Sequence, residues 1–84
     1  MAESVLQVLI RFTSEMADIR EDKINEKSTI SDLGLDSLDK TELAFNIERH
    51  YDLLIPDDEL EEVKTVKEFE QVINEALEFK ESSR

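Results

Sequence analysis

The sequence predicts an all-α fold: a four-helix bundle with three longer helices, one short helix and a long first loop, in a single domain spanning residues 1–84. Three observations support this prediction. Apolar residues recur every three or four positions in several stretches, which is the spacing of one face of a helix. The chain has one glycine and one proline, so few positions interrupt a helix. Hydrophobic residues make up 39%, which favours a folded chain although 38% of its residues are charged.

The first helix is expected to begin after Ser4, whose hydroxyl is a good N-cap, and to reach about Ala17. The apolar residues on its expected core face are Val5, Leu9, Phe12 and Met16, widened by Leu6, Val8 and Ile10. From Asp18 to Leu35 the helical period is lost, which predicts a long loop. Loops of this length are unusual in compact domains unless they are functional or pinned. The residues expected to pin it to the core are Ile19, Ile24, Ile30 and Leu33.

The second helix is expected from Ser37 to about Asp52. Its core face is formed by Leu43, Ala44, Ile47 and Tyr51, which a 100° rotation per residue brings together. Leu38 and Phe45 fall on the opposite face among charged residues. Two large apolar groups in such a setting indicate a docking patch, unless a loop or the last helix covers them.

The rest of the chain predicts two more helices. A short one runs from Asp58 to Val63, with Asp57 as its cap, and depends on tertiary contacts because it is so short. A final helix opens at a capping box beginning with Thr65 and extends through about Phe79. The remaining residues, 80–84, are expected to be frayed.

The turn before the second helix presents a serine. Gly34 is the only glycine and suits a backbone angle that other residues avoid. Asp36 is the expected N-cap, and its carboxylate can accept from the free amides near Asp39. Ser37 then occupies the first helical position with its hydroxyl outside the packed face. A phosphate on that oxygen would lie near unpaired N–H groups and the positive end of the helix dipole.

This stretch resembles the phosphopantetheine attachment site of acyl carrier proteins. The resemblance rests on Asp32-Leu33-Gly34, Asp36-Ser37-Leu38-Asp39 and Glu42-Leu43, and continues in Ile55-Pro56-Asp57-Asp58-Glu59 and Thr65-Val66. It implies that Ser37 is linked through a phosphodiester to 4′-phosphopantetheine, whose thiol carries acyl groups as thioesters, with Asp36 supporting the attachment geometry. It further implies a non-catalytic carrier that a phosphopantetheinyl transferase modifies from coenzyme A and that serves fatty-acid or related synthesis enzymes.

The expected partners are enzymes with basic patches. The residues assigned to partner binding are Leu38, Asp39, Glu42, Phe45 and Glu48. The net charge of −12 argues against nucleic acid and favours fast, charge-steered encounter with basic proteins. Thr41 replaces the family's usual valine, and Arg49 and His50 stand where acids are common. These departures leave open a general fatty-acid carrier or a specialised one for a polyketide or modified lipid, whereas a peptidyl carrier would have a glycine-rich approach to the serine.

The residues give little support to a catalytic site or a metal site. Ser37 and His50 are 13 positions apart, so one helix cannot bring them together as nucleophile and base. An EF-hand counted from Asp32 would need glycine and glutamate where Ser37 and Leu43 stand, and no cysteine is present, so neither a catalytic nor a metal site is expected. With no membrane span or signal peptide evident, a cytoplasmic monomer is expected. The rival hypothesis is an acidic helical adaptor that binds partners without any prosthetic group.

Overall fold

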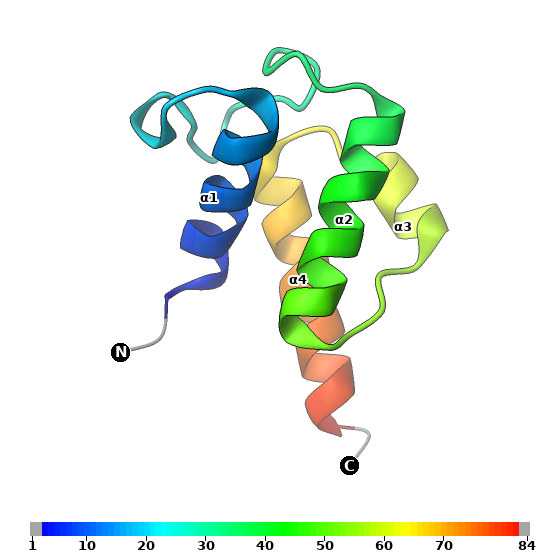
Figure 1. Ribbon diagram of the computed structural model, residues 1–84. Helices are drawn as coiled ribbons and strands as arrows, with labels where there is room; N and C mark the ends of the chain where they lie inside the picture. Colours follow the sequence, from blue (N-terminus) through cyan, green and yellow to red (C-terminus); the bar gives the residue numbers. More distant parts are fainter. Residues whose placement is uncertain (1–2, 83–84) are drawn as a thin grey trace.

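The computed structural model describes residues 3–82, which form an all-α bundle as predicted. Its elements are α1 (Val5–Ala17), η1 (Glu21–Lys23), α2 (Ser37–Tyr51), α3 (Asp57–Glu62) and α4 (Val66–Ser82). In Figure 1, α1 runs up to the long loop, whereas α2 and α4 run away from it, so that α2 begins where the loop ends. Among residues 3–82 no helix has both the length and the apolar character needed to cross a membrane.

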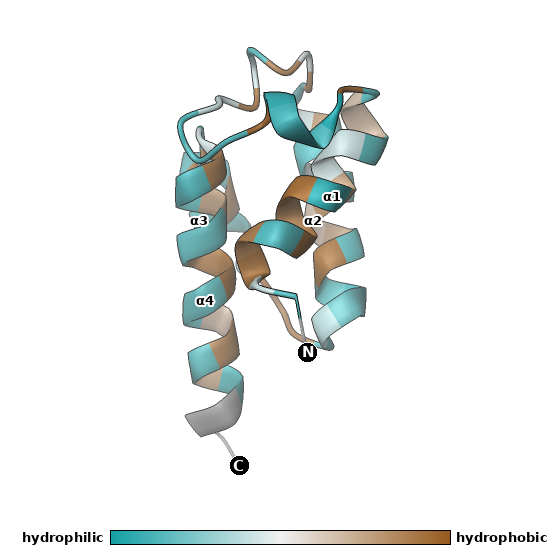
Figure 2. Cartoon of the chain, turned by 90° about the vertical axis from the view of Figure 1, so that its left-hand side faces the viewer, coloured by the Kyte–Doolittle hydropathy of each residue, from teal (hydrophilic) through white to brown (hydrophobic). Residues whose placement is uncertain are grey.

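One core lies between the helices. α1 packs against α2 and α4, and α3 packs against α4. Figure 2 shows the apolar sides of α1 and α4 turned toward the interior and their polar sides turned out. The largest fully buried side chains are Phe69, Leu9, Leu43, Ile47, Ile73, Val8 and Val66. Complete burial of one such side chain stabilises the fold by about 1.5–3 kcal/mol.

The expected core face of α1 is confirmed in part. Leu9 and Val8 are at most 2% exposed as expected, and Val5, Phe12 and Met16 are half-buried but pack against the core. Thr13, which was not expected there, is fully buried. The reason is that α1 contacts two helices at once, so the line between those contacts is the most enclosed. Thr13 can lie there because its hydroxyl donates to the carbonyl of Leu9 at 2.7 Å.

The long loop is pinned at most of the predicted positions. Ile24, Ile30 and Leu33 are buried as expected, whereas Ile19 is only half-buried. The short 3₁₀ turn η1 was not expected from the pattern. Backbone bonds also tie the loop to the start of α4: the N–H of Ile30 donates to the carbonyl of Lys64, and that of Val66 to Ser28, both at 2.9 Å.

The bounds of the last two helices also differ from expectation. α3 begins at Asp57, one residue early, because the carbonyl of Pro56 accepts the first helical bond, from Leu60, at 3.1 Å. The expectation that Asp57 caps α3 is therefore wrong. α4 continues to Ser82 instead of ending near Phe79, because Lys80 Nζ donates to the carbonyl of Tyr51 at 2.9 Å and holds the last turn against α2. Residues 80–82 are thus helical rather than frayed, and residues 83–84 lie outside the described part.

Candidate functional site

A pinned turn delivers the chain to the start of α2. Gly34 has φ +81°, a left-handed conformation that favours glycine, as the sequence predicted. Its N–H donates to the carbonyl of Ser31 at 3.0 Å, and the N–H of Leu35 donates to Ile30 at 3.1 Å. Leu33 and Leu35 on either side of the glycine are buried. The turn is therefore held both by its own hydrogen bonds and by two anchors in the core.

A reciprocal capping box opens α2. Asp36 Oδ1 accepts from the N–H of Asp39 at 2.9 Å, and Asp39 Oδ2 accepts from the N–H of Asp36 at 3.1 Å. The first bond was predicted and the second was not, because the usual partner at that position is Glu or Gln. Ser37 is the first helical residue and its side chain is exposed. The hydroxyl is thus accessible, on a backbone that the cap holds in place.

A shallow pocket of about 320 Å³ lies beside Ser37, between the long loop, α2 and the segment after α3. Its lining residues are Thr29, Ile30, Ser31, Asp36, Ser37, Lys40, Val63 and Lys64. Lys40 lines this pocket, and its ammonium donates to the carbonyl of Val63 at 3.0 Å and to that of Glu61 at 3.4 Å. The two lysines were not singled out from the sequence. Lys40 is only three positions after Ser37, but nothing local shows that it reaches Val63 or that residue 64 returns to residue 37.

The outer face of α2 carries the apolar residues that the pattern placed there. Leu38 is 79% exposed and Phe45 is 56% exposed, so among the described residues no loop or helix covers them. Glu42 is also exposed, whereas Asp39 is half-buried and engaged in the capping box. Leu54, 83% exposed, lines a shallow pocket with Phe45 and was missed, because the sequence does not show which of Leu53 and Leu54 turns inward.

Glu48 also belongs to the fold. Its Oε2 accepts from the N–H of Ile55 at 2.7 Å, and its side chain is half-buried. The bond joins the end of α2 to the connection that leads into α3. At least one oxygen of Glu48 is therefore occupied in holding the backbone, which distinguishes this residue from the exposed Glu42.

The far half of α2 offers no partner for Ser37. His50 stacks edge-on against Phe12 and against Tyr51, with ring centroids 5.4 Å and 4.8 Å apart.

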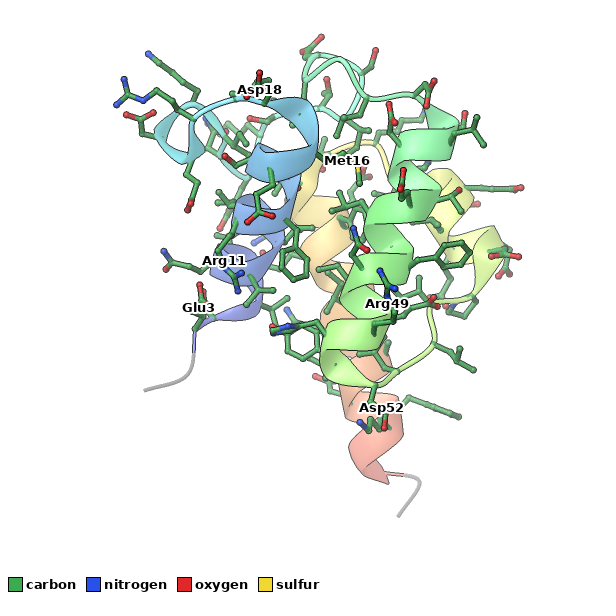
Figure 3. All side chains as sticks on the ribbon, viewed as in Figure 1. Glu3, Arg11, Met16, Asp18, Arg49 and Asp52 are labelled. Atoms are coloured by element: carbon green, nitrogen blue, oxygen red, sulfur yellow. The ribbon has the colours of Figure 1, made fainter. Side chains whose placement is uncertain are left out.

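Burial raises the pKa of Tyr51, helped by the nearby Glu3, whereas Arg11 opposes that rise. Figure 3 shows Arg11 of α1 and Glu3, which precedes α1, directed toward one another, and their closest atoms are 2.8 Å apart. It also shows Arg49 on the side of α2 that faces the viewer. Within residues 3–82 no cluster of His, Cys, Asp and Glu side chains has the arrangement of a metal site.

A more apolar cavity, of about 620 Å³, lies among the α2–α3 connection, α3 and the later turns of α4. Its lining includes Leu53, Leu54 and Phe79. Leu53 follows the end of α2, whereas Ser37 begins it, and a helix of this length spans about 22 Å. The cavity is therefore not part of the surroundings of Ser37.

Comparison with known proteins indicates the family of the chain. The family model described as "Phosphopantetheine attachment site" matches residues 7–73. An acyl carrier protein from Phenylobacterium zucineum (strain HLK1) is 39% identical over 74 residues, which are 87% of this chain and 94% of that protein.

Two solved structures are similar in fold. An acyl carrier protein from Thermotoga maritima superimposes with a TM-score of 0.72 at 26% identity, covering 93% of this chain and 96% of that one. A mupirocin didomain ACP superimposes with a TM-score of 0.78 at 28% identity, covering 92% of this chain. This chain spans 43% of the length of that didomain protein.

Proposed function

Because the chain belongs to the phosphopantetheine-attachment family of acyl carrier proteins, we propose that Ser37 is its attachment residue and that the 84 residues form one carrier domain. The observation that carries the proposal is an exposed serine at the first position of α2, on a backbone held by the Asp36–Asp39 capping box. The adjacent pocket gives the start of the arm room to lie against the surface. These residues fit the group.

The proposed modification uses the hydroxyl of Ser37 as the nucleophile. Its oxygen forms a bond to the phosphorus that carries the pantetheine arm in coenzyme A, the phosphoanhydride bond breaks, adenosine 3′,5′-bisphosphate leaves, and the serine proton passes to a base. His50 is remote on the same helix, so the transferase supplies that base. Asp36 contributes by fixing the backbone at Ser37. The attached group then supplies the thiol that a chain without cysteine lacks.

The outer face of α2 is the proposed docking surface. Its members are Leu38, Asp39, Glu42, Phe45 and Glu48, with Leu54 added beside Phe45. Exposed apolar side chains supply the buried contact of a complex, and the surrounding carboxylates speed encounter with basic surfaces. Glu48 contributes charge while it holds the backbone of Ile55. The partners of such a surface are the modifying transferase and acyl-chain synthesis enzymes.

The direct test measures the intact mass of the purified chain after incubation with coenzyme A and a broad-specificity phosphopantetheinyl transferase. We expect the wild type to gain one phosphopantetheine and Ser37→Ala to gain none. Ser31→Ala is the matched control, because Ser31 lines the same pocket and is exposed. No gain on the wild type, or an equal gain on Ser37→Ala, would contradict the proposal.

The thioester cargo is part of the same proposal. We propose that the loaded chain carries acyl groups for fatty-acid synthesis or for a related lipid or polyketide pathway. The similarity to an acyl carrier protein over most of both chains, and the fold shared with a mupirocin ACP, support an acyl cargo and leave both pathways open. Mass spectrometry of the species carried in the native host distinguishes them by the acyl group. If Ser37→Ala bound its partners as well as the loaded wild type, the chain would be an adaptor instead.

A further inference from the structure

Two cations lie beside Ser37 on an otherwise acidic chain. Lys40 and Lys64 line the same pocket as Ser37, although only 10 of the 84 residues are Lys or Arg and the net charge is −12. Asp36 lines the pocket too, and Asp39 lies one turn away. An anion attached to Ser37 would meet repulsion from these two carboxylates. The lysines are therefore placed where their charge offsets that repulsion.

Lys40 is the better placed of the two. It follows Ser37 by three positions, so the two share a helix face, and helical side chains lean back toward the preceding turn. Its Nζ is 3.0 Å from the carbonyl oxygen of Val63 and 3.4 Å from that of Glu61. An ammonium has three N–H donors, one more than these two carbonyls accept. The charge is thus held over the pocket with donor capacity remaining.

The same contacts connect Lys40 to α3. Glu61 and Val63 belong to the end of α3, where the helix dipole is negative and a cation is favourable. None of the six residues of α3 is basic, so Lys40 supplies from α2 the charge that α3 does not provide. A group on Ser37 that binds the Lys40 ammonium is therefore linked, through this one side chain, to the end of α3.

We propose that Lys40, with Lys64 beside it, binds the phosphodiester on Ser37 and so couples the loaded state to the end of α3. The ligand is a singly charged phosphodiester, which the ammonium binds by charge and hydrogen bonding. Lys40 takes no part as an acid or a base. Lys40 is a positioning residue: it orients the start of the arm over the pocket. This inference rests on the proposed attachment at Ser37 and adds what holds the group once it is there.

The test uses the loaded protein and ³¹P NMR of its phosphodiester. We expect the ³¹P chemical shift of the wild type to differ from that of Lys40→Met. At high salt the wild-type shift should approach the Lys40→Met value, because screening weakens the ion pair. Lys40→Arg should retain the wild-type displacement, because it keeps the positive charge. Lys23→Met is the control with the same change in net charge, on the exposed turn η1.

Amide hydrogen exchange at residues 60–64 provides a second readout. Loading should slow exchange there in the wild type and Lys23→Met, and should leave it unchanged in Lys40→Met. Circular dichroism checks that each variant is folded. Lys64→Met, which leaves the contacts of Lys40 with Glu61 and Val63 in place, repeats the NMR comparison with a smaller expected shift. Should Lys40→Met not fold, Lys40→Gln, which keeps a donor but loses the charge, takes its place.

The outcomes separate the two proposals. If the wild type takes up no phosphopantetheine, the attachment fails and this inference fails with it. If all variants are loaded but the ³¹P resonance is the same in the wild type, Lys40→Met and Lys23→Met, only the phosphodiester role of Lys40 is overturned. Lys40 would then be a cap for α3 alone, and the carrier function would stand.

Discussion

The carboxylate of Glu48 accepts a hydrogen bond at 2.7 Å from the backbone N–H of Ile55, seven residues further along the chain. Ile55 is 5% exposed, so its N–H has little access to water. The bond therefore satisfies a donor that would otherwise be buried without a partner, and it sets where the chain turns after α2. One acid on the face proposed for docking is thus also an element of the fold.

Replacing Glu48 by alanine should lower the free energy of unfolding by about 1–3 kcal/mol, the cost of leaving a buried donor without an acceptor. Glu48→Gln should lose less, because its amide oxygen can still accept. Urea unfolding measures both. Glu42→Ala is the control on the same helix, since Glu42 is exposed, and should change stability by no more than about 0.5 kcal/mol. Equal losses for Glu48→Ala and Glu42→Ala would contradict the role of this bond.

Gly34→Ala should destabilise the chain by about 1 kcal/mol through backbone strain alone. A Cβ at Gly34 would meet no atom within 4 Å, so the cost comes from the φ of +81° and not from a clash. Gly34→Asn should cost less, because asparagine tolerates the left-handed region better. Thermal or urea unfolding should show stability decreasing from the wild type to Gly34→Asn to Gly34→Ala. An alanine variant as stable as the wild type would show that the turn can relax to a negative φ.

Acid should weaken the start of α4 through Glu68. Its carboxylate accepts from the N–H of Lys64 at 2.9 Å and of Thr65 at 3.0 Å, and these bonds lower the pKa of Glu68 below its usual value of 4.5. A carboxyl with a lowered folded-state pKa adds stability above the unfolded-state pKa, and this is lost as the pH falls through the folded value.

The wild type should therefore lose more stability than Glu68→Gln between neutral pH and a pH below 4.5. Urea midpoints at several pH values measure the difference. Glu75→Gln, also on α4 and exposed, is the control and should follow the wild-type curve. Parallel curves for the wild type and Glu68→Gln would show that the capping bonds do not depend on the charge.

Leu38→Ala and Phe45→Ala should each reduce the catalytic efficiency of the phosphopantetheinyl transferase about fivefold or more, the effect of losing over 1 kcal/mol at an interface. Their stabilities should change by no more than about 0.5 kcal/mol, because both side chains are largely exposed. Phe79→Ala is the control for an exposed aromatic residue on another helix. Steady-state loading rates provide the measurement. If Leu38→Ala and Phe45→Ala are loaded as fast as Phe79→Ala, this face of α2 is not the docking surface for the transferase.

Many of the features predicted correctly from the sequence are those that a few neighbouring residues decide. Ser4, Asp36 and Thr65 each accept from an N–H three residues ahead, and Gly34 adopts its positive φ inside a short turn. Such caps and turns depend on local hydrogen bonds and backbone sterics, so the pattern of residue types is enough to find them. The exposure of Ser37 followed from the same local geometry.

Tertiary structure alone decided which residues from distant segments meet. Lys40 reaches a carbonyl 23 residues away and Lys80 one 29 residues away, and the second contact extends α4 beyond its predicted end. Packing against two helices fully buried Thr13, which the apolar pattern had not singled out, and left Phe12 and Met16 only half-buried. The physical reason is that helical spacing defines a face but not its neighbours, because neighbours depend on how the whole core closes. The position of Ser37 could thus be predicted from the sequence, whereas the contact of Lys40 with Val63 and the approach of Lys64 to the same pocket depend on the fold.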